Sequence, residues 1–252
     1  MRPSREWLGW VVPLSALVAW QCLMRAGPAE GGTLVPPSAV LARAGALWSD
    51  GSLREALLAS AGRYLAGLSI GAAAGVGCGI ALGVSRLARA LFGPTLRTLQ
   101  QITLFAWIPL IMAWFGLGEP SKVVFIALAA FFPAMVNTFE GVGSIAPALV
   151  EVGRVFRFGR GQMLAHVVLP SALPSIFTGL HLAVIYAWLA TLGAEYLLTT
   201  GNGLGNLLVE GQELFQTDEV LVGIVLVAAI GFLAGWLVER LQAHWLRWKT
   251  AP

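Results

Sequence analysis

Six long runs without a charged residue constrain the fold of this chain more than any other feature. They are Trp7–Met24, Tyr64–Ser85, Thr98–Gly118, Val123–Phe139, Val167–Ala194 and Val220–Val238. About 20 apolar residues span a bilayer core as a helix, and a helix satisfies its own backbone hydrogen bonds in lipid. Only 12% of the residues are charged, about half the usual share in soluble domains. We therefore expect an all-α protein with about six transmembrane helices.

The first run has two interpretations. Arg2 and Arg5 precede it, as in a signal peptide. The apolar part of a signal peptide is shorter, about 7–15 residues. Tryptophans near both ends of the run suit the two interfaces of a retained helix. We expect this helix to be retained.

A longer polar stretch separates the first and second runs. It opens with Gly31, Gly32, Pro36 and Pro37, a composition typical of a loop. From Ser38 onward, apolar residues at helical spacing predict a helix at the membrane interface. We expect three parts: an N-terminal transmembrane helix at residues 1–27, an extracytoplasmic loop with an interfacial helix at 28–60, and a membrane core at 61–252.

Basic residues gather on one side of the membrane if the chain starts in the cytoplasm and crosses six times. Eleven of the 16 then fall in cytoplasmic segments: Arg2, Arg5, Arg86, Arg89, Arg97, Arg154, Arg157, Arg160, Arg240, Arg247 and Lys249. The outer segments hold Arg25, Arg43, Arg54, Arg63 and Lys122. Because cytoplasmic loops carry the excess of basic residues, we expect both termini in the cytoplasm.

Five glycines recur at every fourth residue of the second run: Gly67, Gly71, Gly75, Gly79 and Gly83. Such a row lets another helix approach closely, because glycine has no side chain. The row drifts around the helix by about 40° per step, so several neighbouring helices can share it. The plainer alternative is the general enrichment of glycine in membrane helices.

Prolines and polar residues mark candidate positions for a transport pathway. Pro109 and Pro133 lie inside the third and fourth runs, where each is expected to kink its helix. Asn137, Glu140 and Glu195 lie near the ends of runs. Polar groups buried in lipid indicate function, but positions near an interface also allow solvation by water. Our candidates for pathway or kink are Pro109, Pro133, Asn137 and Glu195.

The sequence predicts no catalytic or ATP-binding site. A phosphate-binding loop needs Gly-x-x-x-x-Gly-Lys-Ser/Thr, whereas Lys122 and Lys249 follow serine and tryptophan. The three histidines show no metal-ligand spacing, and no pairing of nucleophile and base is visible. We therefore expect a chain that is not an enzyme and holds no metal or cofactor. If ATP drives it, a separate subunit binds ATP and Mg²⁺.

The polar segment between the fourth and fifth runs, expected in the cytoplasm, carries a family resemblance. It begins Glu151-Val152-Gly153-Arg154-Val155-Phe156-Arg157-Phe158-Gly159 and ends Val167-Val168-Leu169-Pro170. It resembles the ATPase-coupling (EAA) loop of binding-protein-dependent ABC importer permeases, which reads Glu-Ala-Ala, three residues, Gly, nine residues, Ile-x-Leu-Pro. Glu151, Leu169 and Pro170 match, but Arg157 occupies the glycine position. We expect Gly159 to supply the turn instead.

Other stretches are similar to permeases of the sulfonate/taurine/nitrate subgroup. They include Leu34–Ser38, Ile108–Leu110, Trp114–Gly116, Phe132–Pro133, Leu169–Leu208 and Phe215–Asp218. The resemblance implies the type I (MetI-like) permease fold in the bacterial inner (plasma) membrane. It also implies a homodimer, an ABC ATPase subunit gripped by residues 150–168, and an extracytoplasmic solute-binding protein, with no nucleic acid partner. The implied function is import of a small anion such as a sulfonate, taurine, nitrate or bicarbonate.

The coupling segment itself has a pattern that suits a docking helix. Val152, Val155 and Phe156 fall on one helix face, with charges at Glu151, Arg154, Arg157 and Arg160. The alternative is a solvated linker between two spans. Two other functions stay open: a permease for another small metabolite, such as a pyrimidine-type precursor, and a secondary carrier. A secondary carrier is expected to show inverted repeats and ionisable groups at mid-membrane, and we see neither.

Overall fold

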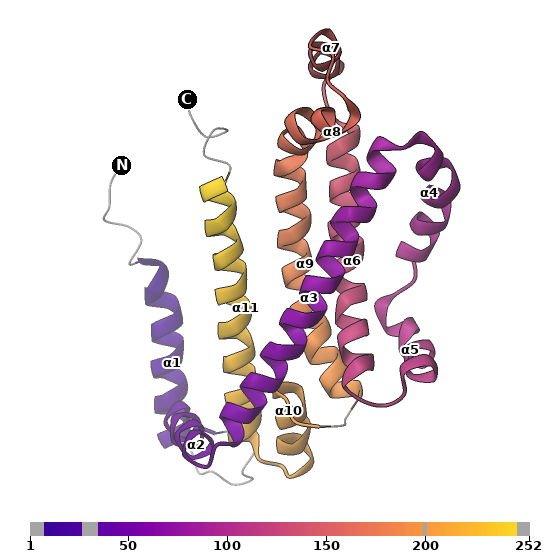
Figure 1. Ribbon diagram of the computed structural model, residues 1–252. Helices are drawn as coiled ribbons and strands as arrows, with labels where there is room; N and C mark the ends of the chain where they lie inside the picture. Colours follow the sequence, from indigo (N-terminus) through magenta and orange to yellow (C-terminus); the bar gives the residue numbers. More distant parts are fainter. Residues whose placement is uncertain (1–7, 27–34, 199–200, 246–252) are drawn as a thin grey trace. The chain divides into compact units, whose positions relative to one another are not determined.

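The structure, a computed structural model, describes residues 8–26, 35–198 and 201–245, and all regular elements in these ranges are helical (Figure 1). The elements are α1 (Leu8–Ala26), α2 (Pro37–Ser49), α3 (Ser52–Val84), α4 (Arg86–Gln100), the 3-10 turn η1 (Leu104–Trp107), α5 (Ile108–Phe115), α6 (Glu119–Gly143), α7 (Pro147–Val155), α8 (Arg160–Met163), the π-helical turn η2 (Leu164–Val168), α9 (Leu169–Leu197), α10 (Leu204–Glu213) and α11 (Thr217–Trp245).

Length and apolar composition identify the helices that can cross a membrane. Within the described ranges, four helices qualify: α3, α6, the stretch from Arg160 to Leu197, and α11. The pair formed by α4 and Leu104–Phe115 qualifies as a fifth, with a bend of 104°. Val11–Met24 in α1 is a shorter apolar helix. The all-α membrane fold is as expected, and these helices are compatible with six spans.

The third run, Thr98–Gly118, is not the single helix that we expected. α4 ends at Gln100, and α5 begins at Ile108 with Pro109 in its first turn. Proline lacks the N–H that an uninterrupted helix would use at this point, whereas the first turn of a new helix does not need it. Pro109 therefore starts α5 instead of kinking a longer helix. By contrast, α6 continues without a break through Pro133.

Contacts divide the described residues into two compact units. One combines the residues up to Ala59 with Asn202–Ala228, and therefore α1, α2, α10 and the first parts of α3 and α11. Within it, α2 is the helix expected after Ser38, and Arg43 of α2 donates hydrogen bonds to Gln216 (2.7 Å) and Glu219 (2.5 Å). The hydrogen bonds that Arg43 donates to the Glu219 carboxylate raise the pKa of the Arg43 guanidinium.

The second unit, Ser60–Gly201 with the residues after Ala228, is built around α6. α3 is inclined across α6 (Figure 1), and its glycine row packs on that helix from Gly67 against Ile126 to Gly83 against Val142. Residue numbers rise together in these contacts, so α3 and α6 run parallel. In the contacts of α9 they run in opposite directions: Gly141 faces Ser175, and Gly179 faces Asn137. α9 is therefore antiparallel to α6.

Close approach explains the glycine row. A Cβ built on Gly75 would lie 2.5 Å from the Phe131 carbonyl oxygen, and one on Gly79 would lie 2.5 Å from the Met135 carbonyl oxygen. Real Cβ atoms do not come so near, so a side chain would push the helices apart. The five glycines, Gly67, Gly71, Gly75, Gly79 and Gly83, all face α6. The row thus serves one neighbour, not the several that its drift suggested, because α3 crosses α6 at an inclination that follows the row.

Candidate functional site

The segment resembling a coupling loop folds into two short helices joined by a tight turn. α7 ends at Val155, α8 begins at Arg160, and α8 continues through η2 into α9. Leu169 begins α9, and Pro170 lies in its first turn, as the sequence predicted. Figure 1 shows α7 and α8 at one end of the α6–α9 pair. The chain is therefore helical without a break from Arg160 to Leu197.

The turn after α7 uses Arg157, not Gly159. Arg157 adopts φ = 53°, the left-handed region, whereas Gly159 is extended at φ = −68° and precedes α8. The N–H of Phe158 donates to the Gly153 carbonyl and that of Arg157 to the Arg154 carbonyl, both at 2.9 Å. These two bonds define a Schellman motif, in which glycine usually takes the left-handed position. The expectation for Gly159 was wrong because hydrogen bonding to the end of α7 fixes the turn two residues earlier.

Packing inside the segment leaves one apolar face open. Gly153 is buried beneath Met163 and Phe158, and a Cβ on it would lie 2.8 Å from the Met163 methyl carbon. Phe158 is half-buried and stacks on Phe156 with ring centroids 6.0 Å apart. On the outer side, Val152, Val155 and Phe156 are 52%, 81% and 69% exposed. An exposed apolar face of this kind is typical of an interaction site.

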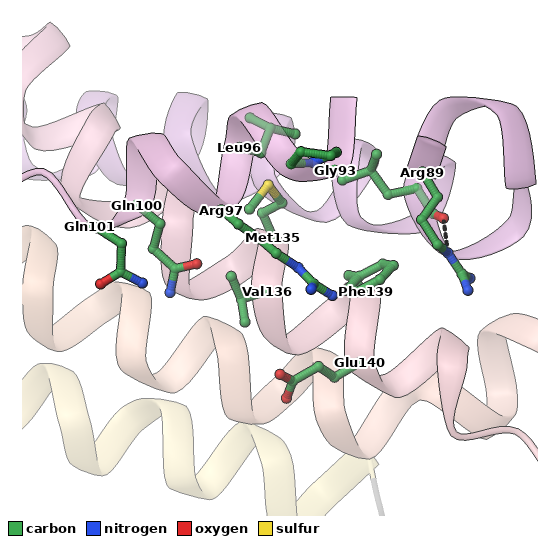
Figure 2. A pocket seen from close by; sticks show the side chains of 12 residues that line it. Arg89, Gly93, Leu96, Arg97, Gln100, Gln101, Met135, Val136, Phe139 and Glu140 are labelled. Carbon is green, nitrogen blue, oxygen red and sulfur yellow. Dashed lines mark hydrogen bonds between the residues drawn. The ribbon is translucent and has the colours of Figure 1, made fainter. Parts of the chain in front are cut away.

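Two pockets lie along α6, beginning at the end that leads into α7. One pocket, of about 740 Å³, lies between α4, the end of α3 and α6, and Figure 2 shows its lining side chains. A second, of about 500 Å³, lies between the α4–η1 break, α6 and α9. The two share Gln100, Gln101 and Val136 and therefore adjoin, and we call them together the groove. Its floor on α6 extends from Leu128 to Glu140.

Two of the candidate pathway residues line this groove. Pro133 and Asn137 both border the second pocket, and the Asn137 amide donates to the Pro133 carbonyl at 2.9 Å. Trp107 also lines this pocket, and its indole N–H is buried without a hydrogen-bond partner in the described part of the chain. A buried donor of this kind is unfavourable unless a ligand or water accepts from it. Pro109 does not appear in the lining of either pocket.

Glu195 lies elsewhere, in a buried ionic cluster at the opposite end of α6. Its carboxylate is fully buried and accepts from Arg63 Nη1 at 2.7 Å and from the Ser60 hydroxyl at 2.7 Å. Arg63 also bonds Glu119, the first residue of α6, at 2.5 Å and 2.7 Å. Lys122 is fully buried, with Nζ 4.0 Å from Glu119. The burial of Glu195 contradicts solvation by water at that position, whereas Glu140 is exposed.

The cluster joins three helices with charges that balance. It comprises Arg63 of α3, Glu119 and Lys122 of α6, and Glu195 of α9. Sequence reasoning placed Arg63 and Lys122 in water-facing outer segments, but both are buried. Their partners are distant in sequence, so no local pattern reveals the cluster. Buried charges are tolerated only when paired and hydrogen-bonded, which this arrangement provides.

Comparisons with known proteins identify the family of this chain. Residues 71–247 match the family described as binding-protein-dependent transport system inner membrane component. SsuC of Bacillus subtilis (strain 168), a permease protein named for aliphatic sulfonates transport, is 33% identical over 99% of this chain and 92% of its own. The taurine transport system permease protein TauC of Escherichia coli (strain K12) is 34% identical over 79% of this chain and 72% of its own.

A third relative extends the range of named solutes. The bicarbonate transport system permease protein CmpB of Synechococcus elongatus is 33% identical over 75% of this chain and 68% of its own. The family match covers α3 from Gly71 onward, all of α6, the groove and the coupling segment. The chain therefore belongs to the binding-protein-dependent transport system inner membrane components, the permeases of ABC importers.

Proposed function

We propose that this chain is the permease subunit of an ATP-driven importer for a small oxyanion, with α7 as the docking helix for the ATPase. The observation that carries the proposal is the exposed apolar face of Val152, Val155 and Phe156, in a family whose transport depends on a binding protein. The chain has no phosphate-binding loop, so ATP and Mg²⁺ belong to the partner subunit.

The helical path from α7 explains how ATPase motion reaches the groove. α7 is tied to α8 by the Schellman turn, and η2 joins α8 to α9. α9 packs on α6 through Gly179, where an added Cβ would lie 2.8 Å from the Asn137 Cβ. Such tight packing passes movement of α9 to the groove floor instead of absorbing it. ATP binding and hydrolysis then shift the population between inward-open and outward-open states.

The oxyanion class rests on the relatives. Their names specify aliphatic sulfonates, taurine and bicarbonate, each of which carries oxygens that share a negative charge. An extracytoplasmic binding protein delivers the solute in this proposal. Two identical chains form the pathway, and apolar side chains that α4 and α5 leave exposed in the single chain are available to lipid or to the second copy: Leu91, Phe92, Leu110, Trp114 and Phe115.

Co-purification with the ATPase tests the docking face. Glu151→Lys and Phe156→Asp are expected to insert in the membrane normally but to retain less ATPase, or to hydrolyse ATP without import. Glu239→Lys is the matched control, since it reverses an exposed carboxylate near the end of α11. Normal ATPase retention and normal uptake of radiolabelled solute by both docking variants would show that α7 is not the coupling element.

A further inference from the structure

The first pocket of the groove contains two arginines that converge on one aromatic ring. The Arg89 guanidinium carbon lies 5.1 Å from the centroid of the Phe139 ring, and that of Arg97 lies 6.0 Å from it. Figure 2 shows Arg97 reaching from α4 toward Phe139 on α6. Both arginines also line the pocket. Cation–π contacts hold the two positive charges near each other in spite of their repulsion.

The two guanidinium groups keep donors for a ligand. Arg89 donates to the carbonyls of Leu82 (3.3 Å) and Gly83 (2.8 Å) at the end of α3, which fixes its position. Two of its five N–H groups serve these bonds. The ring of Phe139 is the contact found for Arg97 in the described part of the chain, where none of the ion pairs involves Arg89 or Arg97.

The rest of the lining suits an anion. Gln100 and Gln101 add primary amides that can donate hydrogen bonds. Glu140 is the one carboxylate among the lining residues, so the pocket carries one net positive charge. Arginine recognises oxyanions through parallel N–H donors on a planar group. The arrangement therefore favours a small group with two or three negatively charged oxygens.

We propose that Arg89 and Arg97 hold the oxyanion group of the imported solute at the coupling-segment end of the groove. The proposal rests on the proposed function and assigns residues to it. A phospholipid headgroup offers similar oxygens, but the first pocket adjoins the second, with which it shares Gln100, Gln101 and Val136. A solute that moves along α6 has a route into this site, and the release of a bound solute is controlled at the end where α7 joins the ATPase.

Charge-selective labelling tests the site without requiring transport. Leu96→Cys, at a lining position that supplies no donor to the anion, is introduced into a chain that also carries Cys22→Ser and Cys78→Ser. The full permease–ATPase complex is placed in phosphatidylcholine nanodiscs and labelled with anionic sulfonatoethyl and cationic trimethylammonioethyl methanethiosulfonate. Two arginines should favour the anionic reagent. Arg89→Gln and Arg97→Gln should each lower the ratio of anionic to cationic rates several-fold, whereas Arg86→Gln, outside the lining, should not.

Protection by free anions identifies the ligand. Ethanesulfonate, taurine, nitrate and bicarbonate are tested separately, and at least one should slow labelling of the parent protein. Arg97→Gln should weaken that protection about tenfold, the effect of losing a charged hydrogen bond, and Arg97→Lys should restore part of it. In proteoliposomes, Arg97→Gln should lower the maximal uptake rate about tenfold and leave solute affinity of the binding protein unchanged.

Three results would overturn the assignment: rate ratios unaffected by either arginine variant, protection by none of the four anions, or protection only when phosphatidylglycerol is added to the nanodiscs. The last result would give the pocket to a lipid headgroup. Failure of the proposed function looks different, because it appears as loss of ATP-dependent uptake in the parent protein. The labelling ratios do not depend on uptake.

Discussion

At the scale of single residues, Arg157 holds a backbone conformation that costs free energy. A residue with a Cβ in the left-handed region destabilises the folded state by about 1–3 kcal/mol. Arg157 adopts this region at φ = 53°. Arg157→Gly removes this cost, although glycine gains entropy in the unfolded chain. We expect a net stabilisation of about 1 kcal/mol and a Tm increase of about 2–4 °C, measured by differential scanning fluorimetry in detergent.

The same substitution three residues earlier is the control for that prediction. Arg154 lies in α7 with ordinary helical geometry, so Arg154→Gly should destabilise by about 1 kcal/mol. A raised Tm for Arg157→Gly and a lowered Tm for Arg154→Gly would establish the left-handed turn. If Arg157→Gly destabilised as much as Arg154→Gly, the Schellman motif would not be present in the folded protein.

The buried carboxylate of Glu195 gives a second prediction at this scale. Glu195→Gln leaves Arg63 buried with only the exposed Glu119 as a full charge partner. Breaking a buried pair costs about 3–5 kcal/mol. After heating, we expect size-exclusion chromatography to recover much less folded protein for Glu195→Gln than for the parent protein. Glu119→Gln should cost far less, because its side chain is 56% exposed. Equal losses for both variants would contradict the burial of Glu195.

At the scale of helices, the glycine row predicts a sharp contrast within α3. Gly75→Leu and Gly79→Leu should lower the folded yield, since overpacking typically costs about 1–3 kcal/mol and both positions touch the α6 backbone. Gly77→Leu should be tolerated, because nothing lies within 4 Å of its Cβ. The measurement is monodisperse protein recovered from membranes. Similar yields for all three variants would mean that α3 does not pack on α6 through this row.

Local pattern predicted the elements better than the contacts between them. Uncharged runs located α3, α6, α9 and α11, and Pro170 marked the start of α9, because burial in lipid and proline geometry act within a few residues. The buried state of Glu195 could not be predicted in this way, since its partner Arg63 lies 132 positions earlier. The arginine pocket depends likewise on α4 folding back beside α6. Arg89 and Arg97 read in sequence as ordinary cytoplasmic charges.

At the scale of the whole molecule, the parallel packing of α3 and α6 constrains the bent pair between them. Gly67 at the middle of α3 faces Ile126 in the first half of α6, and Gly83 at the end of α3 faces Val142 at the end of α6. The chain leaves α3 at the same end where α6 finishes, yet it must return to the end where α6 starts. Only α4, η1 and α5 lie between the two helices. This pair must therefore cross the membrane despite its 104° bend.

The membrane crossing by the α4–α5 pair, together with the distribution of basic residues, predicts a topology that can be tested. α6 ends at the cytoplasmic side if α7 binds the ATPase, and two further crossings, by α9 and α11, return the C-terminus to the cytoplasm. A reporter active only outside the cytoplasm should be inactive when fused after Ser85 or Pro252 and active when fused after Gly118. A cytoplasmic fluorescent reporter should give the opposite pattern.

Equal activity after Ser85 and Gly118 would show that α4 and α5 form a re-entrant loop. High extracytoplasmic activity after Pro252 would contradict the placement of α7 in the cytoplasm, because the same two crossings connect them.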